Sequence, residues 1–261
     1  MPTVQADGCP INYEVEGAQN APVLILSNSI GTTLRMWDDQ APMFSKHFRL
    51  VRYDRRGHGK SGAPKGPYTM ERLARDALAV ADAVGAKKFN WCGLSLGGMV
   101  GQWLGANAPE RLNKMVISNT NFYYADKQAW DDRIKLVTEK GMVALADPMM
   151  ERWFPPEFRA SSPEKVARVR AMFVATPVDG FVGCAYAIRA MDFRESNKRI
   201  SVPTLVVVGA KDVATIPAYG EEMVRQIKGS KLASIPDAGH VANIAQPKIY
   251  ADTVINFLTS H

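Results

Sequence analysis

Cysteine is scarce in this chain of 261 residues, which contains only Cys9, Cys92 and Cys184. The three cysteines lie far apart and show neither the paired spacing of a metal site nor a CxxC motif, so the pattern indicates no bound metal. An odd number of widely separated thiols is typical of a protein from a reducing compartment. We therefore predict free thiols and a cytoplasmic location.

Long hydrophobic runs are also absent. No apolar segment approaches the roughly 18 residues that a membrane-spanning helix needs, and residues 1–17 lack the basic and apolar regions of a secretory signal. The net charge of +6 arises from 32 Lys and Arg against 26 Asp and Glu, which are mixed along the chain. Because no basic stripe forms, we expect neither nucleic acid nor a membrane as a partner. The surplus is diffuse and is compatible with steering a small anionic substrate.

Short apolar segments rich in β-branched residues alternate with segments of helical periodicity. The predicted strands are residues 11–15, 23–27, 48–53, 89–93, 114–118, 204–209 and 231–235. The predicted helices between the later strands are residues 70–84, 96–106, 217–227 and 249–258. Near-continuous apolar strands separated by helices predict an α/β fold with a mostly parallel central sheet flanked by helices. The first two strands are close enough in sequence for a hairpin.

This alternation stops between residues 122 and 199. Helix-like segments at residues 127–140, 142–153, 163–176 and 180–190 follow one another there without a convincing strand. Prolines break helices inside the segment, and Val202-Pro203 returns the chain to the sheet. We predict a catalytic core made of residues 1–121 and 200–261, with residues 122–199 inserted as an all-helical cap.

One serine lies in a motif that is typical of nucleophiles. The motif Gly93-Leu94-Ser95-Leu96-Gly97 joins a predicted strand to a predicted helix. In this setting a G-x-S-x-G sequence forms a tight, strained turn that exposes the serine Oγ, and glycines avoid collisions with neighbouring elements. The N–H of Leu96 at the start of the helix is expected to point toward a developing oxyanion. The alternative is a glycine-rich turn with a bystander serine.

A serine hydroxyl is a weak nucleophile until a base takes its proton. The histidines are His47, His58, His240 and His261. Enzymes with the strand–serine–helix motif carry the triad in the order serine, acid, histidine. His240 follows a late strand and fits this order, whereas His58 precedes Ser95. We favour His240 as the base and interpret His58 as a turn residue that bonds the backbone.

The acid should also follow a strand, because catalytic groups collect at the carboxyl ends of strands in open α/β sheets. Asp212 comes just after the apolar segment 204–209 and is our candidate. Its alternative role is to cap the helix that begins near Pro217. Asp237 lies closer to His240 in the sequence, but its place before Ala238-Gly239 favours a role in shaping the turn.

With Ser95, Asp212 and His240 placed, the chain resembles the α/β-hydrolase superfamily throughout and, more narrowly, the 3-oxoadipate enol-lactonases. The segments that carry this resemblance are residues 27–32 with Met36-Trp37, residues 53–61, residues 93–98 and residues 237–240. The second and fourth segments are general to the superfamily, and the first and third are more specific. The resemblance implies an α/β-hydrolase fold.

The segment after the first parallel strand departs from the usual pattern. Many relatives carry His-Gly where this chain has Asn28-Ser29, and the loop supplies a second backbone donor to the oxyanion. Aligned on the following Gly31, the resemblance implies that this donor is the N–H of Ile30. Because a backbone group donates, the departure does not by itself disable the oxyanion hole.

The resemblance also implies a reaction. Ser95 would open 3-oxoadipate enol-lactone through an acyl-enzyme, and water would release 3-oxoadipate, a step in aromatic-compound (protocatechuate/catechol) degradation. No metal or organic cofactor is needed for this chemistry. The partner implied is a small anionic lactone.

The carboxylate of such a substrate needs a cation, and the cap is the expected source. Trp130 and Arg133 lie one helical turn apart and would present an aromatic wall and a bidentate fork on one face. Arg189 and Arg194 are competitors for this role, and Trp153 is a further candidate for the pocket wall. Each of these has the alternative of an ordinary surface or core position.

Other functions remain open from the sequence. A general carboxylesterase or a cofactor-free perhydrolase of the same fold would share every catalytic residue. A non-catalytic ligand receptor is a different class on the same fold, although such receptors usually lose a triad member. The sequence also leaves a homo-oligomer open.

Overall fold

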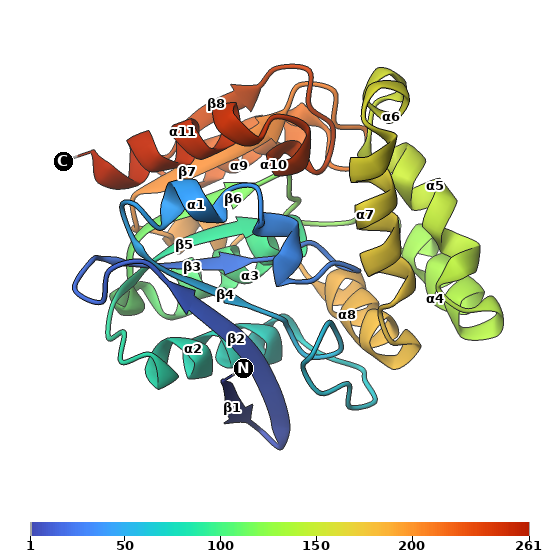
Figure 1. The fold of residues 1–261 in the computed structure, drawn as a ribbon, viewed down its shortest axis with the longest axis horizontal. Coiled ribbons are helices and arrows are strands. Elements are labelled where there is room, and N and C mark those ends of the chain that lie inside the picture. Colours follow the sequence, from blue (N-terminus) through green and yellow to red (C-terminus); the bar gives the residue numbers. More distant parts are fainter. Residues whose placement is uncertain (1, 261) are drawn as a thin grey trace.

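Eight strands form one sheet in the computed structural model, which describes residues 2–260 (Figure 1). The strands are β1 (Thr3–Ala6), β2 (Cys9–Glu16), β3 (Val23–Ser27), β4 (Arg49–Tyr53), β5 (Phe89–Leu94), β6 (Leu112–Ser118), β7 (Thr204–Gly209) and β8 (Lys231–Ile235). Their order across the sheet is β1-β2-β4-β3-β5-β6-β7-β8. All pairs from β4 to β8 are parallel, and β1 and β2 are antiparallel additions at one edge. The predicted, mostly parallel sheet is confirmed.

The predicted hairpin between residues 11–15 and 23–27 is wrong. β2 pairs with β1 and β4, and β3 lies beyond β4, parallel to it. The hairpin that does form joins β1 to β2 through Asp7-Gly8, whose φ angles of 51° and 69° suit a two-residue turn. β3 is almost wholly buried and therefore takes a central position, whereas more than half of β2 is exposed or only partly buried, as suits a strand near the edge.

Helices cover both faces of the sheet. The longer ones are α2 (Met70–Ala83), α3 (Leu96–Asn107), α9 (Pro217–Gln226) and α11 (Pro247–Thr259). The shorter ones are α1 (Ala41–Phe44), α10 (Ala242–Ala245), η1 (Leu34–Trp37), η2 (Pro109–Arg111) and η3 (Asn197–Arg199). In Figure 1, α1 and α11 lie on one face, and α2, α3 and α9 lie on the other. The sheet therefore forms the middle of a three-layered core.

The core-facing side of α2 shows how the sequence pattern produces this layering. Leu73, Ala77, Val80 and Ala81 recur at helical spacing, and all four are buried. Thr69 caps the start of the helix, because its side chain accepts a hydrogen bond from the N–H of Arg72. A capped start and one apolar face are sufficient to fix the helix against the sheet.

Five α-helices between β6 and β7 lie together at one end of the sheet (Figure 1). They are α4 (Gln128–Lys140), α5 (Val143–Trp153), α6 (Pro156–Ser161), α7 (Pro163–Val174) and α8 (Val178–Ala190). Tyr123 and Asp192 form an isolated antiparallel bridge, which brings the two ends of this stretch together. We call these five helices the cap.

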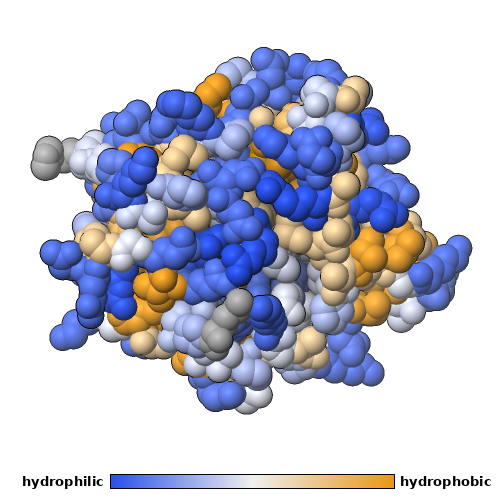
Figure 2. Space-filling view, in the orientation of Figure 1, coloured by the Kyte–Doolittle hydropathy of each residue, from blue (hydrophilic) through white to orange (hydrophobic). Residues whose placement is uncertain are grey.

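The surface in the same view is mostly hydrophilic, and its hydrophobic residues lie in small separate patches (Figure 2). Within residues 2–260, no single helix is long and apolar enough to cross a membrane. Only α7 and α8 together pass the length and composition test, and these two helices are bent by 94° at the break between them.

Candidate active site

The three predicted catalytic residues meet at the carboxyl ends of the strands. Ser95 follows β5, Asp212 follows β7 and His240 follows β8. The Oγ of Ser95 lies 2.9 Å from Nε2 of His240, and Nδ1 of His240 lies 3.0 Å from Oδ2 of Asp212. All three side chains are buried. The three side chains are thus within hydrogen-bond reach in the order that a nucleophile, a base and an orienting carboxylate would take.

Ser95 occupies a strained turn. Its φ of 56° and ψ of −115° lie outside the regions that side chains favour. The turn is possible because Gly93 and Gly97 lack a Cβ, which would lie 2.1 Å from the carbonyl oxygens of Gly97 and Ser27 respectively. Strain of this kind persists only where the surrounding structure enforces it, and here it holds the serine hydroxyl above the sheet.

Asp212 is held by several hydrogen bonds besides its contact with His240. Its Oδ1 accepts from the N–H groups of Ala214 and Thr215, and its Oδ2 accepts from Thr215 Oγ1 and Asn119 Nδ2 as well as facing His240. Burial alone would raise the pKa of Asp212, but the attraction of His240 and these hydrogen bonds together lower it. The carboxylate therefore stays ionised beside the base.

The two predicted oxyanion donors come from different segments next to Ser95. Leu96 is the first residue of α3, and Ile30 lies in the loop after β3 and lines the cavity beside Ser95. Within the described part of the chain, neither backbone N–H donates a hydrogen bond to another protein group. Both amides are therefore available to an oxygen placed next to Ser95.

The remaining histidines do not reach the nucleophile. His58 is fully buried, and its Nε2 accepts a hydrogen bond from the Gly31 N–H at 2.9 Å. Burial and the nearby Arg55 lower the pKa of His58 to about 3, so this ring is neutral. His47 lies at the opposite end of the sheet, and His261 lies outside the described residues.

The rival acid also has another role. Asp237 adopts a φ of 53° in the turn after β8, and its carboxylate pairs with Lys211 at 2.9 Å. The side chain is exposed. The expectation that Asp237 shapes its turn agrees with this position.

A cavity of about 200 Å³ opens between the cap and Ser95. Its lining includes His240, Trp130, Arg133 and Trp153, so all three residues predicted to bind substrate face the same space as the nucleophile. The guanidinium of Arg133 stacks over the Trp130 ring, 4.7 Å from its centroid. The indole N–H of Trp130 is buried and has no hydrogen-bond partner among the described residues.

Trp153 also contacts His240 directly. Its ring centroid lies 5.8 Å from that of His240, and its carbonyl accepts the His240 N–H at 2.9 Å. Gly239 leaves room for this approach, because a Cβ there would lie 2.6 Å from the same carbonyl oxygen. The end of α5 thus packs on the loop that carries His240.

Arg152 is a cavity residue that the sequence reasoning missed. It precedes Trp153 in the last turn of α5, and that proximity was the available signal. The competitors Arg189 and Arg194 lie outside the cavity lining and pair with Asp131 and Asp192.

Neither Arg133 nor Arg152 has a carboxylate partner within residues 2–260. Burial lowers the pKa of Arg133, and repulsion from Arg152 lowers it further. Asp126 is the only carboxylate on the cavity lining; it is exposed and accepts a hydrogen bond from the Gln128 N–H. The cavity therefore carries a net positive charge.

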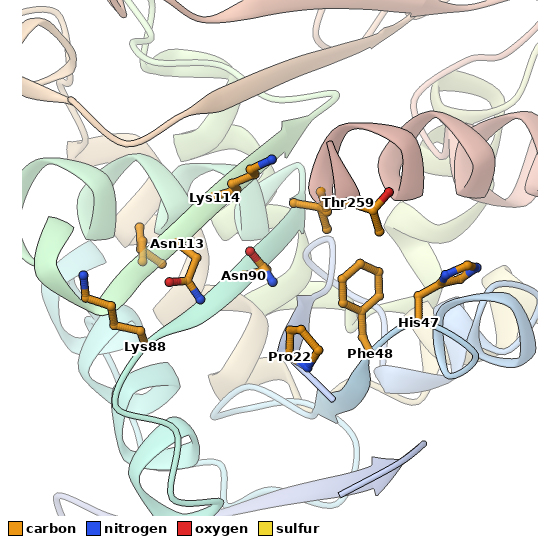
Figure 3. Close-up of a pocket in the computed structure, with 10 residues that line it drawn as sticks. Pro22, His47, Phe48, Lys88, Asn90, Asn113, Lys114 and Thr259 are labelled. Carbon is orange, nitrogen blue, oxygen red and sulfur yellow. The ribbon is translucent and has the colours of Figure 1, made fainter. Parts of the chain in front are cut away.

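A larger cavity, of about 540 Å³, lies at the amino ends of the strands. Figure 3 shows Asn90, Lys114 and His47 around it, on β5, on β6 and before β4. It contains no serine paired with a base, so its size does not make it the reaction site. Within residues 2–260, no three His, Cys, Asp or Glu side chains gather as metal ligands would.

Comparison with known proteins defines the class. The chain matches the family model of the alpha/beta hydrolase fold over residues 22–247. The protein therefore belongs to the α/β-hydrolase family and is a hydrolase, and the fold class predicted from the sequence is confirmed.

A more particular likeness is to enol-lactonases. The chain is 36% identical over 252 residues to 3-oxoadipate enol-lactonase 2 of Acinetobacter baylyi, covering 97% of this chain and 94% of that protein. The crystal structure of the enol-lactonase from Burkholderia xenovorans LB400 matches with a TM-score of 0.97 and 39% identity, covering 99% of this chain and 100% of that one. A putative carbamate hydrolase RutD of Caulobacter segnis is 27% identical over 267 residues, covering 99% of each chain. The resemblance to 3-oxoadipate enol-lactonases is confirmed.

Proposed function

We propose that the protein hydrolyses 3-oxoadipate enol-lactone to 3-oxoadipate in the degradation of aromatic compounds (protocatechuate/catechol), with Ser95, His240 and Asp212 as catalytic triad. The observation that carries this proposal is a nucleophile with its base at 2.9 Å, facing a cavity that also holds two arginines without carboxylate partners. The likeness to named enol-lactonases supports the choice of substrate. The cavity volume of about 200 Å³ suits a small molecule.

The reaction begins when Ser95 Oγ attacks the lactone carbonyl and His240 Nε2 takes its proton. The oxygen of the tetrahedral intermediate accepts hydrogen bonds from the N–H groups of Ile30 and Leu96. Collapse breaks the bond to the ring oxygen and expels an enolate, which takes the proton from His240 and tautomerises to the ketone. Water, activated by His240, then attacks the acyl-enzyme and releases the acid. Asp212 holds the Nδ1–H tautomer and stabilises the imidazolium.

The carboxymethyl arm of the lactone is an anion, and the cap provides its counter-charges. Arg133 and Arg152 supply two cations, and the unpaired indole N–H of Trp130 supplies a neutral donor. Charge-assisted hydrogen bonds from arginine are strong and orient a carboxylate in a plane. A neutral ester has no carboxylate for these groups to bind, so they add nothing to its affinity.

A substrate panel tests the proposal. We expect kcat/KM for the enol-lactone to exceed that for p-nitrophenyl acetate and for a simple alkyl carbamate by at least ~100-fold, which corresponds to one or two charge-assisted hydrogen bonds. Faster turnover of the aryl ester would indicate a general carboxylesterase. Faster turnover of the carbamate would favour the activity named for the more distant relative. Ser95→Ala should lower turnover of every substrate by at least ~10⁴-fold.

Charge-removing variants test the role of the cap. Arg133→Met and Arg152→Met should each raise KM for the lactone about 10–100-fold and leave hydrolysis of p-nitrophenyl acetate nearly unchanged. Arg189→Met is the matched control, because Arg189 lies in the same cap but pairs with Asp131 outside the cavity. An equal loss for the charged and the neutral substrate would contradict the assigned role.

A further inference from the structure

We propose that His58 is a positioning residue for the oxyanion hole: by accepting the Gly31 N–H, it fixes the loop whose Ile30 N–H faces the reaction. This inference rests on the proposed acyl-enzyme mechanism. It gives a function to the histidine that the triad does not use. His58 belongs to the turn between β4 and α2, and Ile30 belongs to the loop after β3.

Of the three backbone amides in residues 29–31, the outer two have partners and the middle one has none in the described chain. The Ser29 N–H faces Met36 Sδ at 3.3 Å, and the Gly31 N–H donates to His58 Nε2 at 2.9 Å. The Ile30 N–H between them donates to no other group in the described chain. Pairing both neighbours and leaving the middle amide free is the arrangement that an oxyanion donor needs.

The His58 ring has only one tautomer that satisfies its partners. Its Nδ1 lies 3.2 Å from the carbonyl oxygen of Arg56, which can only accept, so Nδ1 carries the proton. Nε2 is then an acceptor and receives the Gly31 N–H. The ring is fully buried, so no water can replace it at this position without rearrangement.

Other contacts hold the rest of the loop, so the hydrogen bond to His58 is the one that fixes the Gly31 peptide group. Arg55 donates to the carbonyl of Asn28, which also accepts the Gly97 N–H at 3.1 Å. Above the loop, Gly31 adopts a φ of 70°, and a Cβ there would lie 2.4 Å from the Phe173 ring of the cap. Removal of the His58 acceptor would leave a buried amide unpaired, and the peptide group next to Ile30 would turn to find a partner.

The test compares His58→Leu, which removes the acceptor, with His58→Gln, which places an amide oxygen at similar reach. In steady-state hydrolysis of the enol-lactone, we expect His58→Leu to lower kcat about 10–100-fold with KM within ~3-fold of wild type, because the donor acts mainly in the transition state. His58→Gln should recover kcat to within about 5-fold of wild type. Rates are expressed per folded protein from active-site titration and circular dichroism.

A second readout reports the oxyanion hole directly. A trifluoromethyl ketone that adds to Ser95 forms a tetrahedral oxyanion, so His58→Leu should weaken its binding about as much as it lowers kcat. Val254→Ala is the stability control, because Val254 is fully buried in α11 and does not line the cavity beside Ser95. This variant should lose stability and keep its kcat.

The outcomes separate the two proposals. If Ser95→Ala retains hydrolysis, the acyl-enzyme mechanism itself is wrong. If Ser95→Ala is inactive but His58→Leu keeps wild-type kcat, or His58→Gln recovers nothing, His58 does not position the hole. If Val254→Ala loses as much kcat as His58→Leu, the effect of His58 is only on stability. The same comparisons hold with p-nitrophenyl acetate, so they do not depend on the lactone.

Discussion

The buried, neutral His58 should make this protein lose stability in mild acid. The pKa of His58 falls from an ordinary 6.5 to about 3, first because of burial and then because of Arg55. Between these two pH values, the unfolded chain binds a proton at His58 that the folded chain does not. The contribution of His58 to the free energy of unfolding is therefore complete above pH 6.5 and declines as the pH falls.

The size of this effect follows from the shift. Each pH unit below 6.5 costs about 1.4 kcal/mol of stability until the folded pKa is reached. At pH 4.5 the loss is about 3 kcal/mol, a large part of the roughly 5–15 kcal/mol that holds a typical domain folded. His58→Gln keeps an acceptor for the Gly31 N–H and does not titrate, so it should escape this loss.

Urea unfolding of both proteins at pH 7.5 and pH 4.5 measures the difference. Carboxylates also titrate in this range, but they are common to both proteins and cancel in the comparison. We expect the variant to gain about 3 kcal/mol relative to wild type on going to pH 4.5. Two-dimensional ¹H–¹⁵N spectra of the histidine rings should show the neutral Nδ1–H tautomer of His58 at pH 5. A relative change below about 1 kcal/mol, or a doubly protonated ring at pH 5, would refute the reasoning.

Three further predictions use other contacts. Asp212→Asn should lower kcat about 10⁴-fold with circular dichroism unchanged, because the base loses its orienting carboxylate; a loss below about 10-fold would argue against Asp212 as the acid. Asp76→Asn should cost about 3–5 kcal/mol in urea unfolding, because it leaves the buried Arg56 guanidinium, 2.7 Å away, without its counter-charge. Gly31→Ala should lower kcat about 100-fold, because its Cβ meets Phe173 and moves the oxyanion loop; an unchanged kcat would show that the loop tolerates this shift.

Much of the fold could be read from the sequence because its signals are local. The strands at residues 23–27, 204–209 and 231–235 coincide with β3, β7 and β8, and the predicted helices lie within a few residues of their observed bounds. Short buried strands and amphipathic helices leave periodic patterns that do not depend on the rest of the chain. The short elements β1, α1, α6 and α10 were not predicted, because segments of four to six residues leave little periodicity. The strand pairing was wrong because which strand lies beside β2 depends on sheet order, which no local pattern encodes.

The same distinction between local signals and long-range packing applies to the candidate active site. The sequence by itself determined the strained turn at Ser95, because only glycines at positions 93 and 97 allow the backbone to approach so closely. It also pointed to Asp212 and His240, since chain order and strand ends restrict the candidates.

Only the tertiary structure decided what surrounds these residues. It brought Arg152 into the cavity beside Arg133 and placed His58 against the loop that carries Ile30 and Gly31. These contacts join residues far apart in sequence, and a side chain's partner across such a distance is set by how the cap and the turns pack. The candidate catalytic residues therefore leave local signals in the sequence, whereas the contacts around them depend on packing between distant segments.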